Sequence, residues 1–69
     1  MKPIGRAETP EEKRVIVERL YEAWLKVPEL RLGQLLENVA DREERDSFFY
    51  TEDEPLVFMV EDFVRSVRP

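Results

Sequence analysis

The sequence predicts a small all-α domain built from three helices. Three observations carry this prediction: a capping box at the start of the first stretch, apolar residues that recur at three- and four-residue steps, and an apolar C-terminal stretch that follows acidic residues and a proline. The 69 residues are enough for one domain. We expect residues 1–8 to be a flexible leader and residues 9–69 to form a single helical domain.

The first predicted helix begins after Thr9. Thr9 is suited to the N-cap, Pro10 to the first helical position, and Glu12 stands three residues after the cap, as in a capping box. Pro28 ends this helix, since proline cannot continue the hydrogen-bond ladder. Its apolar stripe comprises Val15 or Ile16, Leu20, Ala23, Trp24 and Val27.

The second predicted helix runs from about Leu30 or Arg31 to about Ala40. Its stripe consists of Leu32, Leu35, Leu36 and Val39. Gly33 falls in its first turn, where glycine costs least, and leaves room for a close backbone approach. The charged residues 41–46 that follow are expected to form a solvated turn or a frayed helix end.

The aromatic run Phe48–Tyr50 is expected to be an extended segment that lies across the helices. An α+β alternative would pair this run with residues 56–60 in a hairpin, although residues 56–60 lack the period-two alternation of a strand. The third helix then opens between Thr51 and Pro55. Either Thr51 or Asp53 is the expected N-cap.

Ten residues form the predicted core of this domain. They are Ile16, Leu20, Trp24, Leu32, Leu35, Leu36, Val39, Leu56, Val60 and Phe63. A chain this short buries only about 60% of its unfolded surface, so its stability is marginal without help. Disulfides are excluded because the chain has no cysteine, which leaves self-association or unusually good helix packing.

The composition argues against most enzymes. Histidine and cysteine are absent, so the commonest general base, the commonest nucleophile and the usual zinc ligands are missing. Only four Ser or Thr hydroxyls are present. We therefore expect a non-catalytic protein without a cofactor.

The net charge and the hydropathy limit the classes of partner that we expect. A net charge of −5 disfavours nucleic acid and anionic membrane surfaces, and the longest apolar run, residues 56–60, is far shorter than a membrane span. A cytoplasmic location is the default expectation. Eight arginines stand against three lysines, which fits either a heat-adapted protein or a GC-rich genome.

Two sets of residues are candidates for a protein interface. Val57 and Phe58 lie off the main stripe of the third helix, so they either form an interface or are covered by residues 48–50. Arg31, Gln34 and Asn38 share one polar stripe of the second helix and suit a polar protein contact better than DNA reading. The expected function is a protein-interaction module that self-associates through the third helix.

The runner-up is an acidic inhibitor or regulator that docks on a basic protein surface, as a nucleic-acid mimic would. Its candidate residues are Glu52, Asp53, Glu54, Glu61 and Asp62. The same cluster suggests a third hypothesis, an enzyme with carboxylate-held Mg²⁺, because Mg²⁺ and Ca²⁺ prefer oxygen ligands. The spaced pattern of a calcium loop is absent.

Two short motifs resemble a group of uncharacterised bacterial and phage proteins. The first is R-x-G-Q-L-x-x-N at residues 31–38, and the second is F-Y-x-x-D at residues 49–53, before a C-terminal helix. The resemblance covers roughly residues 20–64 and implies a small bacterial cytoplasmic protein without an assigned activity. Pro55 and the apolar pair Val57–Phe58 depart from the more polar third helix of that group.

Overall fold

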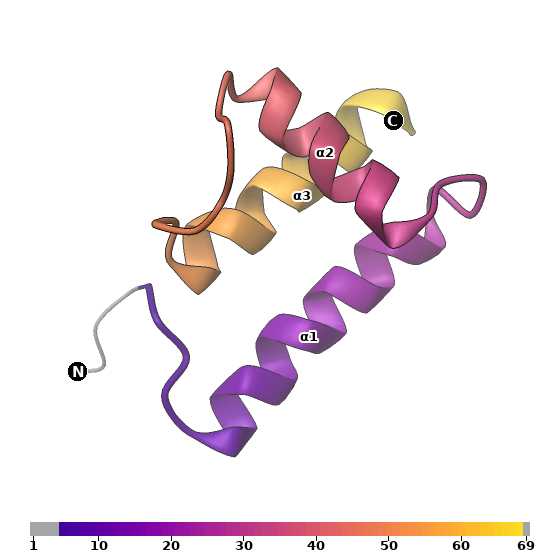
Figure 1. The fold of residues 1–69 in the computed structure, drawn as a ribbon. Helices are drawn as coiled ribbons and strands as arrows, with labels where there is room; N and C mark the ends of the chain where they lie inside the picture. The colour runs from indigo at the N-terminus through magenta and orange to yellow at the C-terminus, as the bar shows by residue number, and fades with distance from the viewer. Residues whose placement is uncertain (1–4, 69) are drawn as a thin grey trace.

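The computed structural model describes residues 5–68 and is all-α. Within these residues the chain forms three helices, α1 (Pro10–Leu25), α2 (Leu32–Arg42) and α3 (Asp53–Val67). Helices α1 and α2 each pack along α3 but only weakly on each other, so they diverge on one side of the molecule (Figure 1). Since residues 5–68 contain no β-strand, the hairpin alternative is wrong.

Helix α1 begins as the sequence predicts. The Thr9 hydroxyl accepts a hydrogen bond from the Glu12 N–H at 3.1 Å, and the Glu12 carboxylate accepts one from the Thr9 N–H at 3.2 Å. This capping box satisfies two N–H groups that a helix start otherwise leaves without partners. The helix ends at Leu25, and Val27 in the following connection is fully buried.

Helix α2 starts slightly later and ends two residues later than predicted, so the first part of the charged stretch 41–46 is helical. The Gln34 side-chain oxygen accepts the Arg31 N–H at 2.8 Å, which caps the helix start. The helix stops where Glu44 adopts a left-handed conformation with φ of 57°, and the Arg45 N–H returns to the Ala40 carbonyl at 2.8 Å.

Helix α3 is capped by the backbone of Gly5, and neither of the two predicted residues, Thr51 and Asp53, is its N-cap. Its N-cap position is Glu52, whose side chain makes no capping bond. The Gly5 carbonyl accepts the Glu54 N–H at 2.8 Å, and the Asp53 carboxylate accepts the Ala7 N–H at 2.8 Å. The Gly5 carbonyl is therefore the hydrogen-bond acceptor that a capping side chain usually provides at a helix start.

These contacts correct the flexible leader expected for residues 1–8. Gly5 and Ala7 are buried, and the described residues 5–8 are fixed against the start of α3. Gly5 has φ of 140°, which favours glycine, and a Cβ built there would lie 3.4 Å from the Glu52 Cβ. Residues 1–4 lie outside the described residues.

The aromatic run before α3 is a turn, whereas an extended segment was expected. The Phe48 carbonyl accepts the Thr51 N–H at 3.0 Å, which closes the turn. Phe48 packs against the core, but the side chains of Phe49 and Tyr50 are 81% and 92% exposed. We call residues 48–51 the aromatic turn.

The core is narrower than predicted and rich in valine. Of the ten expected core residues, Leu35, Val39 and Val60 are fully buried, and the other seven are half-buried. Buried residues outside the expected set are Ala7, Ala23, Val27, Val57 and Val64. Most of the buried side chains are small or β-branched, and the larger side chains lie at the rim because three short helices cannot enclose them.

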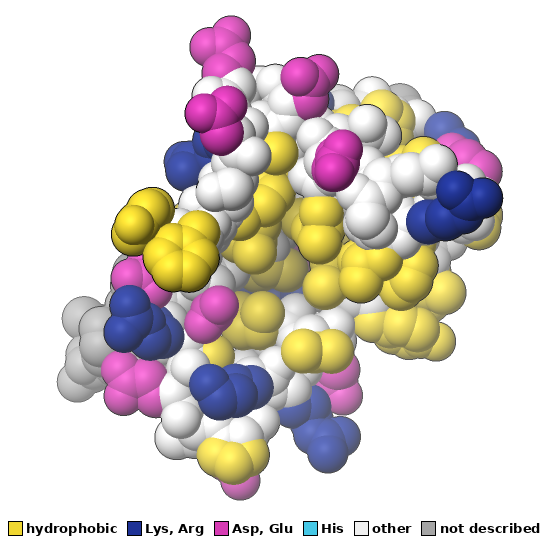
Figure 2. All heavy atoms as spheres, viewed as in Figure 1, with side chains coloured by type: hydrophobic (Ala, Val, Ile, Leu, Met, Phe, Trp, Pro, Cys, Tyr) yellow, Lys and Arg dark blue, Asp and Glu magenta, His cyan; other side chains and the backbone are white. Residues whose placement is uncertain are grey.

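The half-buried rim leaves apolar surface on one face of the molecule. Figure 2 shows hydrophobic side chains gathered between α1 and α2, and two more that project at the left, where Figure 1 places the aromatic turn. Among the described residues, no helix has the length and apolar character needed to cross a membrane.

Candidate interaction surface

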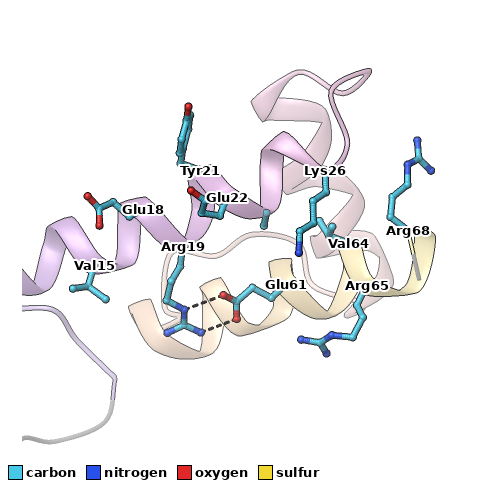
Figure 3. Close-up of a pocket in the computed structure, with 11 residues that line it drawn as sticks. Val15, Glu18, Arg19, Tyr21, Glu22, Lys26, Glu61, Val64, Arg65 and Arg68 are labelled. Carbon is cyan, nitrogen blue, oxygen red and sulfur yellow. Dashed lines mark hydrogen bonds and ion pairs between the residues drawn. The ribbon is translucent and has the colours of Figure 1, made fainter.

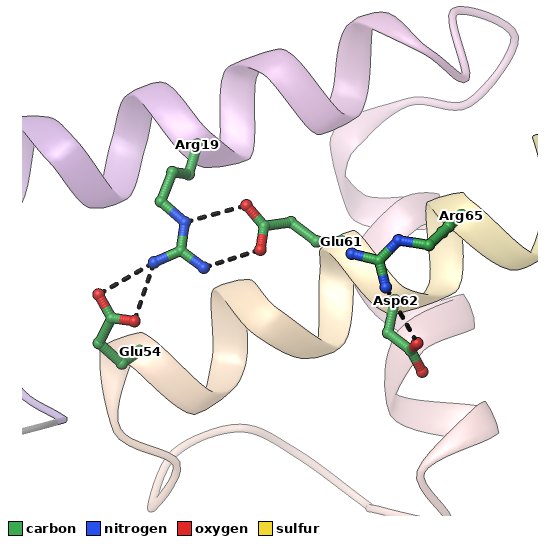
Figure 4. A network of polar contacts seen from close by, with 5 residues as sticks. All are labelled: Arg19, Glu54, Glu61, Asp62 and Arg65. Carbon is green, nitrogen blue, oxygen red and sulfur yellow. Dashed lines mark hydrogen bonds and ion pairs between the residues drawn. The ribbon is translucent and has the colours of Figure 1, made fainter.

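The acidic candidates on α3 are engaged inside the molecule. Arg19 of α1 lies between two of them: its Nη1 donates to the Glu54 carboxylate at 2.8 and 3.0 Å, and its Nε and Nη2 donate to Glu61 at 2.9 and 2.7 Å (Figure 4). The pairing with Glu61 is bidentate and half-buried, and Arg19 thereby fixes α1 on α3. We call these three residues the Arg19 clamp.

The remaining three acidic candidates have partners too. Asp62 lies 3.3 Å from Arg42 Nη2 and 3.5 Å from Arg65 Nη1. Glu52 pairs with Arg6 at 3.1 Å, and Asp53 accepts the backbone N–H described above. This cluster therefore presents less free charge to a basic partner than its sequence suggests.

The Arg19 clamp shifts the pKa values of Glu61 and Arg19. Hydrogen bonds from Arg19 lower the pKa of Glu61 below its ordinary value, although partial burial opposes this effect. Hydrogen bonds to Glu61 and then to Glu54 raise the pKa of Arg19. On the exposed surface, the hydrogen bond to Glu52 likewise raises the pKa of Arg6.

The structure gives the Mg²⁺ hypothesis no assembled site. Across residues 5–68, no three carboxylates converge closely enough to hold a metal ion. The carboxylates that would supply the ligands instead face the guanidinium groups of Arg6 and Arg19 and the N–H of Ala7. Their geometry serves helix packing and capping.

A charged groove of about 710 Å³ lies between α1 and α3. Arg19 and Glu61 pair across it, and Tyr21, which contributes to its edge, points away from that pair (Figure 3). Arg19 and Glu61, whose side chains cross the groove, are hydrogen-bonded to each other, so neither of them is a free acid or base.

The polar candidates of α2 are exposed and do not act as one group. Gln34 is occupied by capping α2, so the R-x-G-Q part of the first motif is explained as a helix start. Arg31, at the N-cap of α2, and Asn38, within α2, are both exposed. In the second motif, Asp53 holds the backbone of Ala7, which is again a structural role.

The apolar pair of α3 is divided between core and surface. Val57 is 2% exposed and packs inside the molecule, so it is not available as an interface residue of the folded chain. Phe58 is 58% exposed. Its neighbours three and four positions away are Glu54, Pro55, Glu61 and Asp62, so the outer face of α3 is charged around a single aromatic ring.

A more continuous apolar surface lies on α1, where the sequence analysis named no candidate. Val17, Tyr21 and Leu25 recur at four-residue steps and are each more than half exposed. They extend the buried stripe, so that apolar side chains cover roughly half of the circumference of α1. Only part of this arc faces α3 or α2, which leaves the remainder for another surface.

This arc ends in a shallow apolar hollow at the connection between α1 and α2. The hollow has a volume of about 280 Å³ and is lined by Tyr21, Trp24, Leu25, Pro28 and Leu30. Trp24 is held in place because its Nε1–H donates to the Leu30 carbonyl at 2.7 Å. The ring thus forms a rigid wall with its only polar atom satisfied, as at many protein interfaces.

Comparison of this chain with models of known protein families, with curated proteins and with solved structures finds no match. The functional interpretation therefore rests on the geometry and chemistry described above.

Proposed function

We propose that this chain is a small non-catalytic protein-interaction module that self-associates through the apolar face of α1. The observation that carries the proposal is the apolar hollow at the end of α1, continuous with exposed Val17 and with the exposed parts of Tyr21 and Leu25. Contact of this apolar surface with water is energetically unfavourable, and association removes the surface from water.

The α1 face replaces α3 as the preferred interface. With Val57 buried, α3 contributes one exposed aromatic ring among charged neighbours, whereas α1 contributes three exposed apolar residues in one row. Apolar burial is roughly proportional to the area removed from water, so the longer row offers the larger driving force. A cytoplasmic location and the lack of a nucleic-acid partner stay predictions from composition and charge.

The experiment is the molar mass in solution, measured by light scattering after size exclusion at low and high salt. We expect the native chain to form an oligomer that persists at high salt, because apolar contacts are not screened. Leu25→Glu should produce a monomer, and the matched control Phe58→Glu should assemble as the native chain does. An oligomer that Phe58→Glu dissociates and Leu25→Glu preserves would return the interface to α3, and a native monomer would overturn self-association.

The acidic regulator is a second proposal, supported on a different surface. Glu37, Asp41 and Asp46 line a shallow hollow of about 380 Å³ at the end of α2 with one cation, Arg45, and within residues 5–68 no ion pair involves these three carboxylates. A basic protein bound there should dissociate steeply as salt rises, since exposed charges are screened within about 8 Å at physiological ionic strength. Lysozyme, as a basic probe protein, should bind native protein more tightly than a Glu37→Gln, Asp41→Asn variant; equal binding would reject this surface.

A further inference from the structure

Residues 5–8 form a strap that runs between the start of α3 and the start of α1 (Figure 1). On the α1 side, Lys13 Nζ donates to the Ala7 carbonyl at 3.0 Å. On the α3 side, the Glu54 N–H donates to the Gly5 carbonyl at 2.8 Å. Buried and exposed residues alternate along the strap, as in an extended segment that lies on a surface. We call residues 5–8 the N-terminal strap.

The N-terminal strap is held mainly by polar contacts. Arg6 pairs with Glu52 through side chains that are largely exposed, and an exposed ion pair contributes little to stability. The Ala7 N–H donates to the Asp53 carboxylate at 2.8 Å. Ala7 is buried but is not a member of the main hydrophobic core, whose buried residues are Ala23, Val27, Leu35, Val39, Val60 and Val64. A segment with so little buried apolar surface opens at a lower free energy than the core does.

Opening of the N-terminal strap affects α1 and α3 unequally. Thr9 and Glu12 cap α1 with their own side chains, so the start of α1 keeps its cap when the strap leaves. At the start of α3, the side chain of Glu52 makes no capping bond, and the Gly5 carbonyl is the acceptor of the Glu54 N–H. Opening therefore leaves α1 capped and removes the cap of α3.

The N-terminal strap also adjoins the aromatic turn. Arg6 and Ala7 line a hollow of about 570 Å³ together with three residues of the turn, Phe49, Tyr50 and Thr51. The turn leads directly into the start of α3, which the strap holds. An opening that releases the start of α3 therefore also loosens the segment that carries the two exposed rings.

We propose that the N-terminal strap is a conformational latch, which opens and closes as one unit while the three helices stay packed. In the closed state it caps α3 and fixes the aromatic turn in one arrangement. In the open state the first turn of α3 and the aromatic turn move together. The pair of Arg19 with Glu61, two helical turns beyond Glu54, holds α1 on α3 in both states. The latch acts within one chain and does not depend on the proposed self-association.

Amide hydrogen exchange of the native full-length chain, followed by NMR, tests the latch. We expect the N–H groups of Ala7 and Glu54 to share one protection factor, because one opening exposes both of them. This factor should be at least about tenfold below that of the Val60 N–H in the core. Equal protection of Glu54 and Val60 would show that the strap opens only when the whole domain unfolds, and would overturn the latch.

Gly5→Ala weakens the closed state from the strap side, without changing α3 or the aromatic turn. The φ of 140° at Gly5 is strained for alanine, so the protection of the Glu54 and Thr51 N–H groups should fall about tenfold. The Glu12 and Val60 N–H groups should keep their protection. The matched control is Gly33→Ala, the same substitution at a glycine inside α2, which should not lower the protection of Glu54 or Thr51.

Three results with Gly5→Ala would contradict the latch. Unchanged protection of Glu54 would show that the strap does not cap α3 through an opening of its own. A loss at Glu54 with none at Thr51 would overturn the joint movement with the aromatic turn. A loss at Val60 by the same factor as at Glu54 would show that the strap belongs to the unfolding unit of the core.

Discussion

The two sides of α1 are built on opposite chemistry. On the α3 side, Arg19 is bonded to Glu54 and Glu61 with four donor–acceptor distances of 3.0 Å or less, and the contact is closed. On the other side, Tyr21 and Leu25 are apolar, exposed and weakly covered by α2. The directional contacts therefore orient α1 within the chain, whereas its non-directional apolar surface is the one that we propose for association.

Removing the Arg19 clamp should have the largest effect of four tests of this comparison. Arg19→Met keeps the side-chain length but leaves Glu54 and Glu61 close together without a cation, so we expect a loss of about 2 kcal/mol in the free energy of unfolding. Urea denaturation followed by circular dichroism measures it. Arg19→Lys, the matched control, keeps the charge but not the bidentate geometry and should lose about half as much. An unchanged midpoint for Arg19→Met would show that the clamp does not stabilise the α3 side.

A substitution on the apolar side of α1 should reduce the free energy of unfolding by less than Arg19→Met does. Trp24→Phe removes the donor to the Leu30 carbonyl and should cost about 1 kcal/mol of stability, because that oxygen loses its partner. It should also weaken association, since the wall of the hollow becomes free to move. Thermal unfolding and light scattering together separate the two effects. Intact stability with weakened assembly would place the role of Trp24 wholly in the interface.

Gly33 on α2 tests whether a partner approaches the open side of the molecule. Apart from its chain neighbours and the backbone of its own helix, no described atom lies within 4 Å of a Cβ built at Gly33. Gly33→Ala should therefore stabilise the single chain by up to about 1 kcal/mol through helix propensity. We expect a higher melting temperature with unchanged molar mass. A variant that is more stable yet no longer assembles would show that a second backbone packs close to Gly33.

The smallest effect that we expect is the loss of the Arg19–Glu61 contribution to stability at low pH. The folded-state pKa of Glu61 is depressed, so its contribution is present above its ordinary pKa of 4.5 and is lost as the pH falls through the lower folded value. We expect Glu61→Gln to be less stable than the native chain near pH 7. The gap should close below about pH 4.5 in thermal unfolding across pH. A gap that stays constant through this range would exclude the ionised carboxylate as its cause.

Local patterns explain how far the fold was predictable. The capping box of Thr9 and Glu12 and the apolar periodicities depend on residues a few positions apart, and both are present in the structure. Burial of Val64 was missed and that of Val57 was left open, because both depend on how α3 packs against other parts of the chain, which no single stretch of sequence records. The start of α3 was misassigned for a related reason, since its cap lies far away in the chain.

The candidate site likewise combines features that the local sequence predicts with features that depend on contacts between helices. The acidic cluster is visible in the sequence, but its pairing with Arg19 across the helices could not be predicted from spacing within one helix. The apolar row at Val17, Tyr21 and Leu25 did leave a signal, namely an apolar arc on α1 wider than one packing face needs. The exposed rings of Phe49 and Tyr50 left no such signal, because an aromatic run is equally suited to a covered segment.

The contact between the Gly5 carbonyl and the Glu54 N–H has a consequence for how the chain is made. A ribosome releases the beginning of a protein first, so residues 5–8 emerge long before the helix whose start they complete. They must wait while more than forty further residues are synthesised. Final closure of the domain therefore waits until the last helix has been made, and a cut just before Thr9 would leave that helix without its cap.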